Sequence, residues 1–432
     1  MNSFAARFAL WSLILLVAVG ARLGAGAWWQ SRMPDERRFT FPDSEGYWEL
    51  GQTIAKGEPY QFGADDARIF RMPGYPLLLA VMFRAVGTDV SPMCGCALSA
   101  LLGGAAVAAA MWWARQLFDG GAALVAGLVV ALYPGAVAMG AFILSEAPFC
   151  PLMILHLALW GAAWRAAAPR QAVGLAFVAG VAAAAATLMR PSWLLFTPFA
   201  LVIGLLCDKR RKQQALIGLV MFTSLSLWLS PWWVRNALLT GHFVPTTLQF
   251  GASLYDGLNP QADGSSNMSY QAPIEAEERA GRGQPRAAGE SLDFEYRLNA
   301  RLRQESVDWA LAHPLRTLQL AGIKFVRIWN VWPNEAQFRS WPLRLAVALT
   351  YVPLLALGVC GAWKFSRWGW PYCLAWLPAV YITLLHMTFV SSIRYREPAM
   401  MALAVLAAGW LTGGRRPKGE PASEPNPTPA IV

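Results

Sequence analysis

The 432-residue sequence contains few charged residues, since Asp, Glu, Lys and Arg together make up 14% of the chain. Soluble domains carry about 25% charged residues, so this composition excludes an ordinary soluble protein. Hydrophobic residues make up 56% of the chain. Apolar runs of about 17–25 residues, the length that crosses a bilayer, recur along most of it. The sequence therefore predicts an all-α polytopic membrane protein.

Metal-binding and nucleotide-binding motifs are also absent. The chain has only four His residues and no HExxH pattern, so the sequence gives no support for a zinc site. Its six Cys are scattered, and Cys94-Gly-Cys96 has no second Cys or His pair, which favours core or lipid-facing thiols over metal ligands. No P-loop and no glycine-rich dinucleotide motif occurs. We therefore predict no cofactor, while the sequence leaves a divalent metal open.

The chain carries a formal net charge of +10, which in a soluble protein would suggest nucleic acid. Here the basic residues cluster in short loops between apolar runs, as membrane topology signals do. We therefore predict no nucleic-acid partner and a multi-pass protein of the inner (cytoplasmic) membrane with both termini in the cytoplasm. The basic residues that this topology places on the cytoplasmic side are Arg7, Arg115, Arg165, Arg170, Lys209–Lys212, Lys364, Arg367, Arg415, Arg416 and Lys418.

About ten apolar runs are predicted to be transmembrane helices. Two shorter runs, Gly74–Val86 and 315–329, are predicted not to cross, because a crossing at Gly74–Val86 would move most basic clusters outside. We expect Gly74–Val86 to be re-entrant or to lie along the outer interface, and 315–329 to form an interfacial helix. The ten predicted spans are residues 8–29, 93–114, 122–141, 148–164, 172–188, 193–207, 215–233, 343–363, 369–389 and 399–411.

The chain is predicted to form one transmembrane domain over residues 1–412. Two long extracytoplasmic loops interrupt it, at 30–92 and 235–341, and each is expected to contain helical segments, at 44–56 and 291–312. Residues 413–432 are Pro-rich and polar, which predicts a disordered cytoplasmic tail.

An acidic motif, Phe41-Pro-Asp43-Ser-Glu45, follows the first span. A carboxylate at this boundary could deprotonate a soluble acceptor while a lipid-borne donor lies in the bilayer beside it, so Asp43 is a candidate catalytic base. The structural alternative is that Asp43 is the N-cap of the helix predicted at 44–56. Glu45 and Glu49 are expected on the solvated face of that helix.

A rigid basic turn, Arg71-Met-Pro-Gly-Tyr-Pro76, precedes the run Gly74–Val86. Its prolines stiffen the backbone and Gly74 allows a close approach, so Arg71 is presented as a fixed cation suited to a phosphate. The alternative is that Arg71 extends to lipid headgroups. We include Tyr75 of the same motif as a candidate phosphate ligand.

Further ionisable residues fall on the same outer face. Glu146 lies at the end of a span, where an acid is costly and is therefore a functional candidate. The outer arginines are not explained by the positive-inside rule, which favours the opposite side, so we interpret them as ligands of a phosphate or pyrophosphate group. Each could instead pair with a Glu or bind headgroups. These arginines are Arg190, Arg235, Arg394 and Arg396.

Seven short motifs occur in order up to about residue 411. Their order resembles that of the bacterial GT-C-type polyprenyl-phosphate-dependent glycosyltransferases, which include protein O-mannosyltransferases and aminoarabinose lipid A transferases. This chain differs in having Asp43-Ser where better-studied members have paired Asp-Glu, and we expect no additional C-terminal soluble domain. The motifs are Asp43-Ser-Glu-Gly-Tyr47, Arg71-Met-Pro-Gly-Tyr-Pro76, Leu144-Ser-Glu146, Leu188-Met-Arg-Pro191, Pro231-Trp-Trp-Val-Arg-Asn236, His313-Pro314 and Arg394-Tyr-Arg-Glu-Pro398.

The resemblance implies that Asp43 is the catalytic base, that Arg71 contacts the donor phosphate and that Glu146 lies near the active site. It also implies a polyprenyl-phosphate sugar donor, an inverting transfer, and an extracytoplasmic acceptor that is a lipopolysaccharide, another glycan, a lipid or a protein. The absence of a nucleotide-binding motif agrees with a lipid-linked donor. The alternatives are a transporter or flippase of polyprenyl-linked glycans, whose ionisable residues usually lie near the bilayer midplane, and a non-catalytic envelope scaffold.

Overall fold

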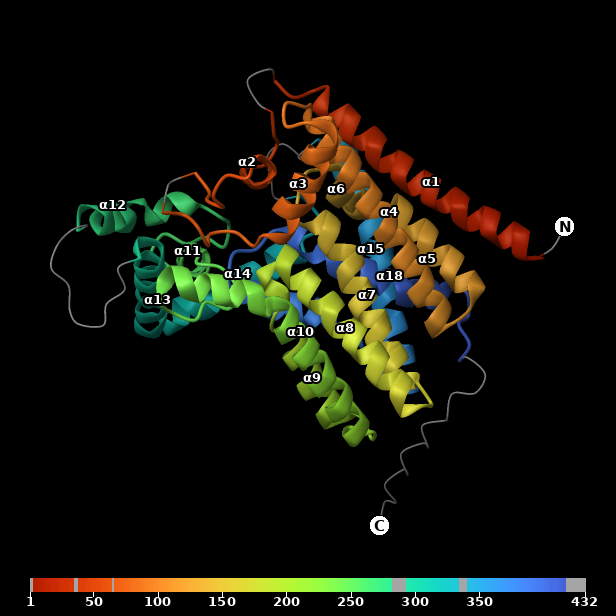
Figure 1. The fold of residues 1–432 in the computed structure, drawn as a ribbon. Coiled ribbons are helices and arrows are strands. Elements are labelled where there is room, and N and C mark those ends of the chain that lie inside the picture. The colour runs from red at the N-terminus through yellow and green to blue at the C-terminus, as the bar shows by residue number, and fades with distance from the viewer. Residues whose placement is uncertain (1–2, 35–37, 64–65, 282–292, 334–339, 417–432) are drawn as a thin grey trace, which may run out of the picture.

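The computed structural model describes residues 3–34, 38–63, 66–281, 293–333 and 340–416. These residues form α-helices and short 3-10 helices and contain no strand, which confirms the predicted all-α class. Figure 1 shows long helices packed side by side, with shorter helices gathered at one side of them. Most of the predicted tail, from residue 417 onward, lies outside the described residues.

Six helices of the described part are long and apolar enough to cross a membrane, judged by length and composition. The number becomes seven if α5 (Gly120–Leu132) and α6 (Pro134–Ala141), which meet at a bend of 60°, form one broken span. The predicted multi-pass membrane class is therefore confirmed. The six helices are α1 (Ser3–Gln30), α4 (Pro92–Leu117), α7 (Glu146–Arg165), α8 (Pro169–Met189), α10 (Arg211–Thr240) and α15 (Trp341–Phe365).

Besides the bent pair α5–α6, three of the ten predicted spans contain only shorter helices. They are α9 (Phe196–Cys207), α17 (Leu377–Thr388) and α18 (Glu397–Leu411), of 12, 12 and 15 residues. At 1.5 Å per residue they extend about 18–22 Å, less than the roughly 30 Å of a hydrocarbon core. For 193–207 and 369–389 the prediction counted apolar residues across prolines, whereas 399–411 was predicted as a run of only 13 residues, and α18 is two residues longer than that run. Both α17 and α18 have a proline in their first turn, a position where its missing amide hydrogen would be unpaired in any case.

The two large loops contain the helices expected in them. The first loop (residues 31–91) contains α2 (Pro42–Lys56) and α3 (Gly74–Val86), and the limits of α3 coincide with those of the predicted run. Its 13 residues are too few for a straight crossing, but its orientation to the bilayer stays a prediction. The second loop (residues 241–340) contains α11 (Phe250–Gly257), α12 (Ala272–Ala280), α13 (Phe294–Ala312) and α14 (Pro314–Ile328).

The two loops are joined by the buried carboxylate of Glu295 in α13. It accepts hydrogen bonds from the backbone N–H of Arg68 at 2.8 Å and of Ile69 at 2.9 Å. Asp293, the N-cap of α13, forms an ion pair with the Arg68 guanidinium. The second loop therefore holds the backbone of the segment that leads to the Arg71 motif.

The break between α5 and α6 is stabilised by a side chain from the first helix. Pro134 has no amide hydrogen to bond the carbonyl of Val130, four residues earlier. The buried guanidinium of Arg22 takes this place, donating to Val130 at 3.0 Å and to Ala131 at 3.2 Å. A cation at the C-terminal end of a helix also complements the helix dipole. Arg22 thereby supports the bend that directs α6 away from α5.

Candidate active site

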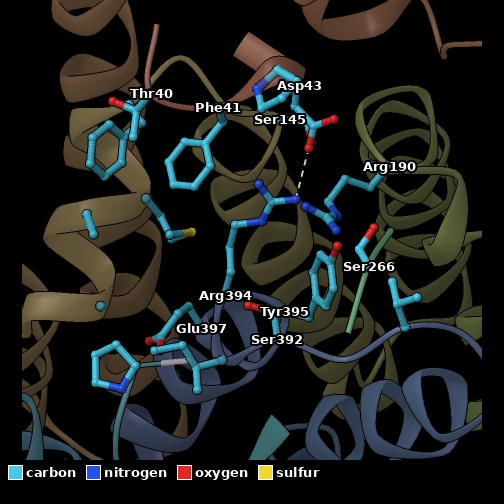
Figure 2. A pocket seen from close by; sticks show the side chains of 18 of the residues that line it. Thr40, Phe41, Asp43, Ser145, Arg190, Ser266, Ser392, Arg394, Tyr395 and Glu397 are labelled. Carbon is cyan, nitrogen blue, oxygen red and sulfur yellow. Dashed lines mark hydrogen bonds and ion pairs between the residues drawn. The ribbon is translucent and has the colours of Figure 1, made fainter. Parts of the chain in front are cut away.

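A cavity of about 1290 Å³ lies where the two loops meet the long helices. In Figure 2, Arg394 is near its centre, Thr40 and Phe41 lie to one side, and Arg190 and Ser266 to the other. Its lining falls into three chemical groups, which are apolar, charged and polar without net charge. The apolar group includes Ala25, Trp28, Val137, Ala138, Phe142 and Val347; the charged group includes Asp43, Arg71, Arg190 and Arg394; the polar group includes Gln249, Ser253, Ser265, Ser266 and Gln271.

Asp43 does not cap α2, so the predicted capping role is wrong. The helix begins one residue earlier, at Pro42, and its N-cap is Phe41, with no side-chain cap. Proline is favoured in the first helical turn because its φ angle is already helical and its missing N–H would be unpaired there. The Asp43 carboxylate points instead at two guanidinium groups: Oδ1 lies 2.9 Å from Nη2 of Arg71, and Oδ2 lies 3.0 Å from Nη2 of Arg394.

Arg394 connects Asp43 to a second, deeper ion pair. It lies in the 3-10 helix η5 (Ile393–Arg396), and its Nε lies 3.1 Å from Oε1 of Glu146, at the start of α7. The same Glu146 oxygen is 2.6 Å from Nη1 of Arg190, which follows α8. Two acids and three arginines thus form one chain of contacts, Arg71–Asp43–Arg394–Glu146–Arg190. The cluster carries one excess positive charge, which favours an anionic ligand.

The charge state of Asp43 follows from these contacts. Burial by itself would raise the pKa of Asp43, but Arg71 and Arg394 outweigh burial and hold the pKa well below its usual range. The carboxylate is therefore ionised at neutral pH. While both arginines contact it, however, it is a weak proton acceptor, because proton affinity falls as the pKa falls.

Arg71 lies inside the protein and does not extend to lipid headgroups. Its side chain is 11% exposed, and its guanidinium carbon lies 5.0 Å from the ring centre of Tyr47 and 5.3 Å from that of Phe62. The hydroxyl of Tyr60 donates to the Arg71 carbonyl at 3.0 Å. Both the head and the backbone of Arg71 are therefore fixed, which contradicts the headgroup alternative and leaves phosphate binding as a prediction.

Arg235 contacts the backbone of the segment that precedes Arg71. It donates from Nη2 to the carbonyls of Arg68 at 3.2 Å and Tyr60 at 3.4 Å, and its guanidinium lies 4.9 Å from the ring centre of Trp232. It does not line the cavity. In this position Arg235 supports the backbone that presents Arg71. Its direct contact with a phosphate stays a prediction.

Tyr75 and Arg396 also lie away from the cavity lining. Tyr75 is fully buried and its hydroxyl lies 3.0 Å from that of Ser99. Arg396 is buried too, donates to the carbonyl of Ile328 at 3.0 Å and lies 3.6 Å from the ring centre of Tyr351. The structure thus brings Asp43, Glu146, Arg71, Arg190 and Arg394 together and leaves Tyr75, Arg235 and Arg396 outside the cluster. A phosphate-binding role for these three stays a prediction.

Two residues that support the site were not predicted from the sequence. Glu295 was expected only as part of a helix, and burial raises its pKa to about 7. Arg22 carried a usable signal, since it is a charged residue within the first apolar run. Among the described residues, no group of three or more His, Cys, Asp and Glu side chains is placed to hold a metal ion.

Comparisons with known proteins place the fold. No protein-family model matches the chain, and no curated protein matches it. The archaeal oligosaccharyltransferase AglB from Archaeoglobus fulgidus, solved with an inhibitory peptide and a dolichol-phosphate, aligns with a TM-score of 0.58 and 15% identity. The alignment covers 94% of this chain and 50% of that one. The chain has the fold of this oligosaccharyltransferase.

Other solved structures extend the comparison. The apo form of the Archaeoglobus fulgidus oligosaccharyltransferase aligns with a TM-score of 0.56 and 15% identity, over 93% of this chain and 50% of that one. ArnT from Cupriavidus metallidurans, bound to undecaprenyl phosphate, aligns with a TM-score of 0.45 and 17% identity, over 92% of this chain and 77% of that one. The chain thus spans about half the length of the oligosaccharyltransferase structures it matches. The fold expected from the motif order is confirmed.

Proposed function

We propose that this protein is a membrane glycosyltransferase that moves a sugar from a polyprenyl-phosphate donor to an extracytoplasmic acceptor. The observation that carries the proposal is the position of Asp43, Arg71 and Arg394 in one cavity with an apolar and a polar lining. The archaeal oligosaccharyltransferase that shares the fold was solved with a dolichol-phosphate, a lipid of the proposed donor class.

The donor would use the apolar and charged parts of the cavity. Its polyprenyl chain would lie against apolar side chains of α1, α6 and α15, such as Trp28, Ala138 and Val347. Its phosphate would lie against Arg71 and Arg394, where hydrogen bonds from guanidinium groups are charge-assisted. These fixed cations would stabilise the negative charge that develops on the departing phosphate, which is electrostatic catalysis.

The sugar and the acceptor would occupy the polar part of the cavity. The side chains of Gln249, Ser253 and Gln271 are uncharged donors and acceptors, which suit the hydroxyl groups of a carbohydrate. The acceptor oxygen attacks the anomeric carbon, the carbon–oxygen bond to phosphate breaks, and the phosphate leaves with the electron pair. Asp43 accepts the acceptor's proton, and in-line attack inverts the anomeric centre.

The proposed topology places the large loops outside the cytoplasm and both termini inside, in the inner membrane. In Figure 1 the end of α9 that joins α10 points away from α2 and α11–α13, and the basic run Lys209–Lys212 follows α9 in the sequence. That separation supports the orientation given by the positive-inside bias. Arginines supply the cations of the proposed reaction, so we also propose that no metal is required.

Transfer from defined donors tests the proposal. The purified protein in nanodiscs is incubated with polyprenyl-phosphate sugars carrying a radiolabelled sugar and with envelope glycolipid or protein acceptors, with and without EDTA. We expect label to move to an acceptor and free polyprenyl phosphate to accumulate, with EDTA making no difference. If no sugar is transferred and no polyprenyl phosphate binds to the wild type, the proposal is wrong.

A further inference from the structure

Both oxygens of Asp43 are engaged by the cations that would hold the donor phosphate. Oδ1 contacts Arg71 at 2.9 Å and Oδ2 contacts Arg394 at 3.0 Å. A carboxylate bound by two guanidinium groups in this way has the geometry and the single negative charge of a bound phosphodiester. The polyprenyl-phosphate sugar expected as donor is also a phosphodiester, so the two anions would compete for the same two arginines.

We propose that Asp43 occupies the donor-phosphate site in the unliganded protein, and that the donor's phosphodiester displaces it from Arg71 and Arg394. This inference rests on the proposed function. Its consequence is an ordered reaction in which the donor binds before proton transfer is possible. The base stays paired until the leaving group is in place, and is then released beside the acceptor.

The arginines can exchange one anion for another because each keeps other contacts. Arg394 contacts Asp43 through Nη2 but Glu146 through Nε, so its position survives when the Asp43 contact is broken. Arg71 keeps the aromatic rings of Tyr47 and Phe62. The side chain of Asp43, in contrast, is 31% exposed, whereas that of Glu146 is 1% exposed. Asp43 is therefore the anion that a ligand can reach and replace. Figure 2 shows its carboxylate above the Arg394 guanidinium, with a dashed line between them.

Charge balance supports the exchange. With Asp43 in place, three arginines face two carboxylates, which leaves one positive charge. With a singly charged phosphodiester on the arginines and the displaced Asp43 still in the cavity, three positive charges face three negative charges and no excess remains. Asp43 then loses the contacts that suppress its proton affinity and becomes a stronger base.

Binding of a small lipid phosphate tests the inference. Asp43→Asn removes the competing charge, and Glu45→Gln is the matched control, because it removes the same charge from an exposed position of the same helix. We measure the binding of farnesyl phosphate, with farnesol as the uncharged probe. A site that is self-occupied binds its ligand more weakly in proportion to its free fraction. We therefore expect Asp43→Asn to bind farnesyl phosphate about tenfold more tightly, with farnesol binding and Glu45→Gln unchanged.

A second measurement uses the wild-type protein and does not depend on the folding of a variant. With ¹³C-labelled aspartate, infrared difference spectra should show an aspartate carboxylate band that shifts when farnesyl phosphate is added and does not shift with farnesol. Equal or weaker farnesyl phosphate binding in a folded Asp43→Asn protein overturns the inference. So does a wild-type band that stays in place while farnesyl phosphate binds. Absence of any farnesyl phosphate binding to the wild type would instead contradict the proposed function itself.

Discussion

Asp43 and Glu146 are two carboxylates that share one arginine, yet their surroundings differ. Both contact Arg394, and each has a second arginine, Arg71 or Arg190. Glu146 is 1% exposed at the start of a membrane helix, whereas Asp43 is 31% exposed on a cavity. A ligand from solution cannot reach and replace a carboxylate that is 1% exposed, whereas it can replace one at a cavity wall. The same kind of ion pair thus stabilises the fold at Glu146, whereas at Asp43 it can be exchanged for a ligand.

Replacing Asp43 should have the largest effect on activity. Asp43→Asn keeps the size of the side chain but cannot accept the acceptor's proton at neutral pH, so turnover should fall about 10²–10⁴-fold. Because Asp43 does not cap α2, Asp43→Ala should lose as much turnover without the cost of a lost cap. Sugar transfer by the purified variants measures this, with Glu45→Gln as the control. Retention of more than about a tenth of wild-type turnover would contradict the catalytic assignment.

Replacing Glu146 should have the largest effect on stability. Glu146→Gln removes a buried charge that pairs with Arg190 at 2.6 Å and with Arg394 at 3.1 Å. Removal of one member of a buried ion pair typically costs about 3–5 kcal/mol of stability. Denaturant unfolding in detergent should show this loss in Glu146→Gln and a much smaller one in Asp43→Asn. Equal losses in the two variants would erase the difference between the buried and the cavity pair.

Glu295 extends the comparison to an acid that accepts hydrogen bonds from backbone N–H groups. Burial raises its pKa from 4.5 to about 7, so the folded protein holds a proton that the unfolded chain releases. Stability should therefore fall as pH rises from about 4.5 to about 7, by up to roughly 3 kcal/mol. Glu295→Gln cannot titrate and should lack this part of the slope. If the free energy of unfolding depends on pH in the same way in the wild type and in Glu295→Gln, Glu295 does not titrate in this window.

Replacing Arg71 should have the smallest of these effects, on donor affinity. Arg71→Ala removes one charge-assisted contact, which typically contributes about 1.5–3 kcal/mol, so the KM for the donor should rise about 10–100-fold. The KM for the acceptor should change little, because the acceptor is proposed to bind in the polar part of the cavity. Separate titration of donor and acceptor measures both. An unchanged donor KM in a well-expressed variant would place the donor phosphate elsewhere.

The charged residues of the site could be identified from the sequence, but the partners toward which their side chains point could not. Asp43, Arg71, Glu146, Arg190 and Arg394 were predicted because each is an ionisable residue at the end of an apolar run. Their partners were not predictable, because the contact between Asp43 and Arg394 joins residues 351 positions apart. No local pattern encodes such a pairing. The capping role of Asp43 was predicted because an Asp preceded the expected helix 44–56, whereas the helix begins one residue before Asp43, at Pro42.

The positions of the long helices and of α3 followed the apolar pattern. The limits of α3 were predicted as the structure has them, because Gly74 and Gly87 bound a continuous apolar run. Two of the helices, α9 and α17, are shorter than the predicted runs, which contain prolines, whereas α18 is two residues longer than its predicted run. Tyr75 and Arg396 lie in motifs that do reach the cavity, through Arg71 and Arg394. The sequence identifies such a motif, but the turn geometry decides which of its side chains points inward.

Arg22 has a consequence for the order in which this protein assembles in the membrane. Its acceptors on α5, the carbonyls of Val130 and Ala131, follow it by 108 and 109 residues. An arginine near the centre of an isolated membrane helix costs about 2.5–3.5 kcal/mol. During synthesis the first helix therefore enters the bilayer before the α5 carbonyls that accept hydrogen bonds from Arg22 have been made. The contact that supports the bend between α5 and α6 thus forms only after α5 has been synthesised and meets Arg22 of α1.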